Sequence, residues 1–239
     1  RTSKQEPQKP PTINSSQIPV GFTQDQLSPY FRKIRISSIS PGTSKSHSTV
    51  SLYASLASGE RVIVTGWSLK TRQGNIAAIP KAVEIYSPFG SQKPADIYLT
   101  AGETLNIYSS SSSIGNFKLN KCMGYLENYY TFTPRLSVGC PAIDRSNIHN
   151  FSSKCQDYIM SLGSCREPNI NAPGIVGESA CQDYLRDINY RGCFERHQDD
   201  SDFSRREWRV WLDKKFLDER HDRVLLFDEK GLLVGEYKY

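Results

Sequence analysis

The sequence predicts a mainly β fold, a sandwich or barrel, into which a disulfide-bonded helical segment is inserted. Short apolar runs recur at roughly ten-residue spacing between residues 30 and 130, as in such all-β folds. Between residues 141 and 222 the apolar residues change to helical spacing, and most of the cysteines fall there. The final residues, 224–239, return to a β pattern.

Length and composition limit the class of protein. The chain has 239 residues, of which 37% are hydrophobic and 23% are charged, enough for one or two domains with a buried core. A run of about 18 apolar residues, which a membrane-spanning helix needs, does not occur. The net charge of +5 permits an acidic partner without requiring one.

Residues 1–29 are predicted to form a flexible linker or tether. Residues 1–11 are rich in Pro and Lys and contain no apolar residue, so they cannot offset the entropy lost on ordering. The remnant of an expression tag is the alternative. Because the sequence begins with Arg1 and not with Met, we expect that a preceding segment was removed, and that any membrane attachment runs through it.

The strands are expected where apolar residues alternate with polar ones. Val50, Leu52 and Ala54 keep the period of two that gives a strand one buried face. Clusters of Gly, Pro and Ser separate this run from its neighbours. Strands are predicted near residues 34–36, 50–56, 61–67, 82–86, 97–99, 104–108 and 116–119.

The helical segment is expected at about residues 141–222, inserted into a single domain of residues 30–239. Tyr158, Ile159 and Leu162 follow helical spacing, and so do residues 184, 185 and 188. After this segment, residues 224–227 and 232–239 form a predicted hairpin, with Gly231 closing the turn. We expect the hairpin to rejoin the sheet that begins near Ile34.

The cysteines favour disulfides and an oxidising compartment, because their number is even and no zinc-ligand spacing is present. A Cys-Gln-Asp-Tyr repeat begins at residues 155 and 181, which suggests two antiparallel helices bridged at both ends. This geometry favours a nested pairing over a sequential one of 155 with 165 and 181 with 193. The nested pairs are Cys155–Cys193 and Cys165–Cys181, and they leave Cys122–Cys140. The localisation that follows is secreted or at the cell surface.

Three segments in order resemble lamin tail domains. Residues 62–69 are similar to that family's Gly-Trp strand, residues 97–108 to its Gly-Glu edge, and residues 223–234 to its last hairpin. Together they span about half the chain, and the added cysteines resemble a variant in small, membrane-tethered bacterial surface proteins. The resemblance implies an immunoglobulin-like β-sandwich and a binding or scaffolding role toward protein or DNA. Its fold-determining residues would be Gly66, Trp67, Gly102, Glu103, Asp228 and Gly231.

No catalytic residue, cofactor or metal is predicted. The Gly-x-Ser-x-Gly elbow of serine hydrolases is absent. The four histidines are not spaced as zinc ligands. Carboxylates in residues 195–202 could hold calcium, but they lack the order of a calcium loop, and a solvated loop is favoured.

Two groups of residues are candidates for binding. One group is basic and could bind phosphates or an anionic polymer; the alternative interpretation is an ordinary surface of mixed charge. The other is a tyrosine pair that could stack on sugar or on a partner surface, and its alternative is packing against the inserted helices. The candidates are Arg32, Lys33, Arg35, Arg205, Arg206, Arg209, Tyr129 and Tyr130.

These observations predict a non-catalytic extracellular binding or structural module, displayed at the cell envelope. Its expected partner is a protein or a cell-wall polymer. The alternative is an extracellular DNA-binding module that uses the basic residues. The oligomeric state is not determined by the sequence.

Overall fold

The computed structural model describes residues 13–43, 46–218 and 222–239, and residues 1–12 of the expected linker lie outside these ranges. The fold is mainly β, as predicted, with three sheets and a few short helices. The chain forms two compact units. Unit 1 comprises the described residues of Arg1–Glu84, Lys93–Lys118 and Arg206–Tyr239, and unit 2 comprises Ile85–Gln92 and Leu119–Arg205.

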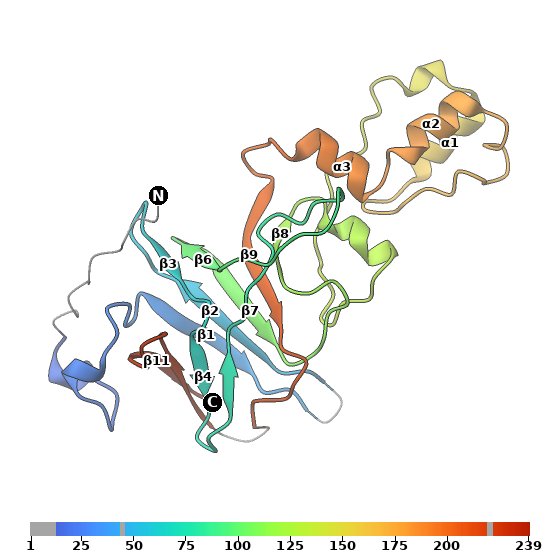
Figure 1. Cartoon of the computed structure of the whole chain (residues 1–239). Helices are drawn as coiled ribbons and strands as arrows, with labels where there is room; N and C mark the ends of the chain where they lie inside the picture. The colour runs from blue at the N-terminus through green and yellow to red at the C-terminus, as the bar shows by residue number, and fades with distance from the viewer. Residues whose placement is uncertain (1–12, 44–45, 219–221) are drawn as a thin grey trace. The chain divides into compact units, whose positions relative to one another are not determined.

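The sheets are short-stranded and mostly antiparallel (Figure 1). Two single-turn 3-10 helices, η1 (Ser15–Gln17) and η2 (Gln24–Gln26), precede them. The five-stranded sheet has the order β1 (Ile34–Ser40), β2 (Thr49–Ala54), β7 (Thr104–Tyr108), β9 (Ser204–Trp211) and β8 (Phe117–Asn120). The four-stranded sheet has the order β11 (Leu233–Lys238), β10 (Arg223–Phe227), β4 (Ser68–Lys70) and β5 (Ile76–Ala78), and β3 (Arg61–Ile63) pairs with β6 (Tyr98–Thr100).

The hydrophobic core of unit 1 draws on all three sheets. Val50, Leu52 and Ala54 of β2 are fully buried, whereas the residues between them are partly exposed, as the alternation predicts. Leu69 of β4 and Leu226 of β10 join the same core from the four-stranded sheet. Trp67 is 1% exposed, and its ring centroid lies 5.7 Å from that of Tyr30. This burial of large apolar side chains is the main force that holds the sheets together.

The strand expected at residues 61–67 is broken by a turn. Gly66 has φ +83°, a conformation that favours glycine, and its amide donates to the carbonyl of Ile79 at 2.8 Å.

A second turn depends on Glu103, which is 4% exposed. Its Oε2 accepts a hydrogen bond from the Thr100 amide at 2.9 Å, and its Oε1 pairs with Lys118 Nζ at 2.7 Å. The buried carboxylate is thereby compensated.

The closing hairpin, β10 and β11, forms as predicted but joins a different sheet. β10 pairs with β4, with Leu226 opposite Leu69, whereas Ile34 begins β1 of the five-stranded sheet. The expectation that the hairpin rejoins the sheet near Ile34 is therefore wrong. Because Leu226 faces the core from the same side as Leu69, pairing with β4 buries both residues in one layer. Gly231 closes the turn with φ +76°.

Three strands, β4, β5 and β9, lie outside the predicted strand ranges, and one predicted strand is absent. β9 lies inside the range expected to be helical. β9 runs parallel to β7, with Leu105 opposite Trp208. The alternation of Trp208 and Val210 was the signal for it. The strand expected at residues 82–86 is reduced to isolated bridges of Ala82 with Ala95 and of Val83 with Phe117.

Unit 2 contains the α-helices (Figure 1). They are α1 (Ser153–Ser161), α2 (Ser179–Arg186) and α3 (Tyr190–His197), together with the 3-10 helices η3 (Met123–Asn128) and η4 (Ile148–Asn150). The Ser152 hydroxyl accepts from the Cys155 amide at 3.2 Å and begins α1. The Asn189 side chain accepts from the Gly192 amide at 2.9 Å and begins α3. None of the described helices is long and apolar enough to cross a membrane.

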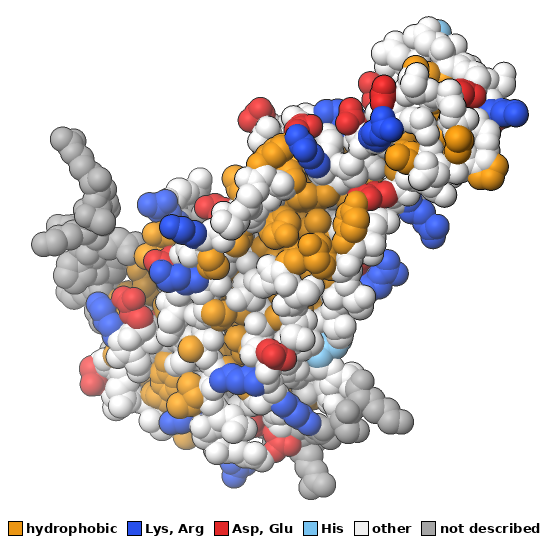
Figure 2. Space-filling model, turned by 45° about the vertical axis from the view of Figure 1, so that its right-hand side comes forward, with side chains coloured by type: hydrophobic (Ala, Val, Ile, Leu, Met, Phe, Trp, Pro, Cys, Tyr) orange, Lys and Arg blue, Asp and Glu red, His pale blue; other side chains and the backbone are white. Residues whose placement is uncertain are grey.

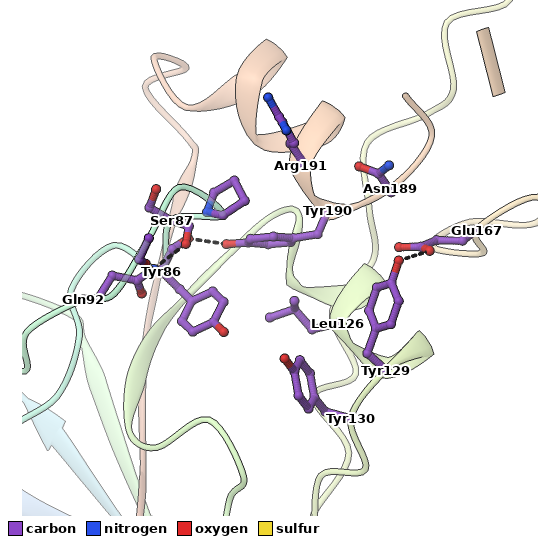
Figure 3. A pocket seen from close by; sticks show the side chains of 12 residues that line it. Tyr86, Ser87, Gln92, Leu126, Tyr129, Tyr130, Glu167, Asn189, Tyr190 and Arg191 are labelled. Carbon is purple, nitrogen blue, oxygen red and sulfur yellow. Dashed lines mark hydrogen bonds between the residues drawn. The ribbon is translucent and has the colours of Figure 1, made fainter. Parts of the chain in front are cut away.

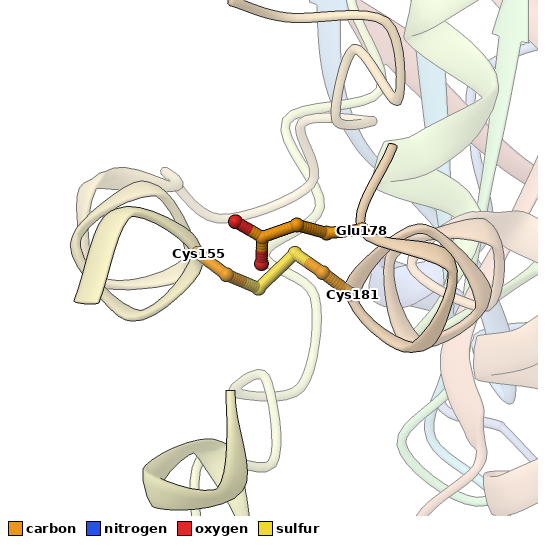
Figure 4. A group of neighbouring side chains, drawn as sticks. All are labelled: Cys155, Glu178 and Cys181. Atoms are coloured by element: carbon orange, nitrogen blue, oxygen red, sulfur yellow. A yellow bond between two sulfur atoms is a disulfide. The ribbon is translucent and has the colours of Figure 1, made fainter. Parts of the chain in front are cut away.

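All six cysteines are oxidised in three disulfides, but the predicted pairing is wrong. The bonds are Cys122–Cys193, Cys140–Cys165 and Cys155–Cys181. The nested pairing assumed two long helices, each with a cysteine near either end. α1 ends at Ser161, before Cys165, and Cys193 belongs to the separate helix α3. The equivalent cysteines of the repeat, each third in its helix, bond to each other instead (Figure 4).

Candidate binding site

A tyrosine-lined hollow in unit 2 is the best candidate site. Its volume is about 450 Å³, and all of its lining residues belong to unit 2. The four tyrosines come from three segments that are far apart in the sequence: the loop of Ile85–Gln92, the end of η3 and the start of α3 (Figure 3). They are Tyr86, Tyr129, Tyr130 and Tyr190. The sequence singled out Tyr129 and Tyr130 but not the other two, because only folding brings the segments together.

Hydrogen bonds fix the tyrosine rings. Tyr190 is 5% exposed; its hydroxyl accepts from Asn120 Nδ2 at 3.0 Å and donates to the backbone carbonyl of Tyr86. Its ring lies edge-on to that of Tyr86, with centroids 5.9 Å apart. Burial raises the pKa of Tyr190 and, together with the neighbouring hydroxyl of Tyr130, that of Tyr86. These phenols therefore stay neutral at physiological pH.

Tyr129 and Tyr130 lie at the end of a 3-10 helix, not on the strand from which their exposure was argued. The side chain of Tyr129 is 62% exposed, and its hydroxyl donates to Glu167 Oε2. Burial and this carboxylate raise the pKa of Tyr129 to about 12. The rings of Tyr129 and Tyr130 are 6.4 Å apart. Phe89, which is 53% exposed, adds a further aromatic side chain near the hollow and packs edge-on against Phe194.

Glu167 is the acidic residue of the hollow. Burial raises its pKa above the ordinary 4.5, an effect that the Tyr129 hydroxyl and the Tyr190 amide partly oppose. In Figure 3 a dashed line joins one carboxylate oxygen of Glu167 to the Tyr129 hydroxyl. The second oxygen, Oε1, is buried and has no hydrogen bond of ordinary geometry. The same holds for Gln92 Oε1, on the opposite side of the hollow in Figure 3.

Two disulfides hold the walls of this hollow. Cys122 precedes η3 and Cys193 lies in α3, so their bond joins the segments that carry Tyr129 and Tyr190. Cys165 lies two residues before Glu167 and bonds to Cys140. The Asn128 side chain also donates to the Cys165 carbonyl, at 2.8 Å. The site is thus preorganised by covalent bonds, which lowers the entropy lost when a ligand binds.

Three of the basic residues predicted to bind lie on β1 or just before it, and one of them is already in an ion pair. Lys33 Nζ pairs with Glu60 at 2.7 Å. Arg32 and Arg35 are exposed, each within 6 Å of an aromatic ring centroid, and both line a hollow of about 410 Å³ in unit 1. Glu236 lines the same hollow, so its charge is mixed.

The basic residues of β9 do not continue the group on β1. In the sheet order, β2 and β7 separate β9 from β1. Arg209 is 7% exposed and pairs with Glu207 at 2.8 Å, whereas Arg205 and Arg206 are exposed. Figure 2 shows Lys and Arg side chains interspersed with Asp and Glu on the face drawn, not gathered in one field.

Two acidic groups resemble cation sites but have another explanation. Cys155, Glu178 and Cys181 lie together, yet both sulfurs are in a disulfide and the Ser152 hydroxyl contacts both Glu178 oxygens at 2.6 Å (Figure 4). In the segment considered for calcium, Lys121 Nζ lies 2.7 Å from Asp200 and also bonds to Asp202. The ammonium of the chain itself occupies the position that a calcium ion would take.

No protein-family model matches the chain, and no curated protein or solved structure is significantly similar to it. The resemblance to lamin tail domains therefore stays a prediction.

Proposed function

We propose that the chain is a non-catalytic binding module that acts outside the cell, at the envelope, and binds a cell-wall polymer in the tyrosine-lined hollow. In this proposal unit 1 is an immunoglobulin-like sandwich of the lamin-tail type, and the disulfide-bonded helical segment carries the site. The three disulfides support an oxidising, extracellular location. A protein partner is the alternative within the same class.

The convergence of the four tyrosines on one hollow is the observation that carries this proposal. Aromatic rings with fixed orientation offer flat apolar faces against which the C–H face of a sugar ring packs, while nearby polar atoms meet the hydroxyls. The hollow is lined on one side by Tyr86 and Tyr190 and on another by Tyr129 and Tyr130. An open, polar and aromatic hollow of about 450 Å³ can hold a sugar unit of a longer chain.

The tyrosines of the hollow are uncharged groups suited to packing against a ligand. The pKa values of Tyr86, Tyr129 and Tyr190 are raised, so these phenols stay protonated. Glu167 is engaged with Tyr129 through one oxygen.

A sedimentation assay with purified, insoluble cell-wall material tests the proposal. We expect the wild-type chain to co-sediment, and Tyr129→Ala to weaken binding by about tenfold, or about 1.4 kcal/mol. Met160→Ala is the matched control, because Met160 is 57% exposed on α1 and does not line the hollow. Wild-type protein that stays in solution, or equal loss in both variants, would refute the proposed site.

DNA binding stays a prediction as the alternative function. A titration of duplex DNA with salt separates it from the proposal, because phosphate contacts make the affinity fall steeply as salt rises. Absence of binding at low salt would remove this alternative.

A further inference from the structure

Two tyrosine hydroxyls of the hollow are already used within the protein. Tyr190 bonds to Asn120 and to the Tyr86 carbonyl, and Tyr129 bonds to Glu167. Tyr130 is a neighbour of Tyr86 and contributes to its raised pKa. A ligand in the hollow therefore meets the aromatic rings, together with whatever polar atoms remain unpaired.

Two buried polar atoms of the hollow lack a hydrogen bond of ordinary geometry, and both are acceptors. They are Glu167 Oε1, near the Tyr190 amide, and Gln92 Oε1. The orientation of the Gln92 amide follows from its surroundings, because its Nε2 donates to the carbonyls of Ser87 and Gly90 and must be the nitrogen. Because buried acceptors without partners cost free energy, the hollow favours a ligand that brings hydrogen-bond donors.

The charge of the hollow also favours a cationic ligand. Among the described residues Glu167 has no ion-pair partner, and burial holds its pKa above the ordinary value. The one basic residue of the lining, Arg191, pairs through Nε with Glu195 at 3.1 Å and places its guanidinium 5.0 Å from the Phe89 ring centroid. The positive charge of Arg191 is thus partly neutralised by Glu195, which does not line the hollow. Tyrosine rings attract cations by the negative potential of their faces.

Resting on the proposed function, we propose that the polymer unit recognised in this hollow is an amino sugar with a free, protonated amine. The ammonium group pairs with Glu167, and the sugar ring packs against the tyrosines. Gln92 Oε1, on the opposite side of the hollow, accepts from a hydroxyl of the polymer. An N-acetylated sugar carries no charge on its nitrogen and has a single N–H, so it leaves the Glu167 carboxylate without an ion-pair partner. A site with such a charge discriminates strongly between two sugars that differ in this one group.

Two oligosaccharides of equal length that differ only in N-acetylation test the inference. We expect isothermal titration calorimetry near pH 6 to give at least tenfold tighter binding for the β-1,4-linked glucosamine oligomer than for its N-acetylglucosamine counterpart. Glu167→Gln keeps the shape of the side chain and removes its charge, so it is expected to abolish the preference. Asp183→Asn is the matched control, because it removes a negative charge of unit 2 that does not line the hollow.

The outcomes separate this inference from the proposed function. Equal affinity for the two oligomers, preference for the N-acetylated one, or a preference that survives Glu167→Gln overturns the inference and leaves the hollow a sugar site. If neither oligomer binds while cell-wall material still does, the inference is overturned and the proposed function stands. If neither the oligomers nor cell-wall material binds, both are overturned. Far-ultraviolet circular dichroism and a count of free thiols establish that each variant is folded and oxidised.

Discussion

Gly124, the second residue of η3, packs against the Cys140–Cys165 disulfide with no room for a side chain. A Cβ at this position would lie 2.2 Å from Cys165 Sγ, 2.3 Å from the Val138 carbonyl oxygen and 3.0 Å from Cys140 Sγ. The first atom is in a disulfide and the second is backbone, so neither withdraws without a larger movement. Gly124→Ala must therefore displace η3 or keep the disulfide open.

The expected loss of stability depends on which of these happens. If the disulfide still closes, overpacking costs about 1–3 kcal/mol. If it stays open, the loop-entropy relation for a separation of 25 residues gives a loss of about 3.5 kcal/mol. Gly139→Ala is the matched control, since a Cβ there has nothing within 4 Å and the residue precedes Cys140 directly.

Denaturant unfolding and thiol counting in denaturant check this prediction. We expect Gly124→Ala to lower the free energy of unfolding by at least about 1 kcal/mol and, where the bond stays open, to show free thiols at Cys140 and Cys165. Gly139→Ala is expected to retain all three disulfides and wild-type stability. A Gly124→Ala protein with three disulfides and an unfolding free energy within about 0.5 kcal/mol of wild type would refute the steric reasoning.

Two further predictions concern unit 1. Asp228 Oδ1 accepts from the amides of Lys230 and Leu232, each at 2.9 Å, so Asp228→Ala is expected to cost about 1–3 kcal/mol in denaturant unfolding; a cost no larger than that of Glu229→Ala at the exposed neighbour would contradict this. The hydrogen bond from Lys33, the largest cause, lowers the pKa of Glu60 below 4.5. Its stabilisation is therefore present above that pH and is lost as pH falls through the lower folded value. Lys33→Met should raise the Glu60 pKa in an NMR titration, and an unchanged pKa would rule out this cause.

The elements that depend on residues close together in the sequence could be predicted from the sequence. The alternation of Val50, Leu52 and Ala54 gave β2, and the Asp228–Gly231 turn gave the closing hairpin. The spacing of residues 158 and 159 and of residues 184 and 185 indicated α1 and α2. Each of these depends on a local period or on a residue with a special backbone conformation.

The arrangement in three dimensions could not be predicted in the same way. β9 pairs in parallel with β7, about 100 residues earlier in the chain, and nothing in either strand specifies the other. The cysteine repeat was recognised, yet the helix lengths decided which sulfurs meet, and those lengths place Cys165 outside α1. The ends of α1 and α2, at Ser161 and Arg186, therefore exclude the pairing that two longer helices would give.

The sequence by itself determined a mainly β chain, an oxidising compartment and two of the four tyrosines, because composition, periodicity and cysteine number are properties of the chain alone. Only the tertiary structure decided the disulfide partners and the hollow in which Tyr86 and Tyr190 join Tyr129 and Tyr130. The physical reason is that a binding hollow depends on distances between segments far apart in sequence, and packing of the whole unit sets those distances.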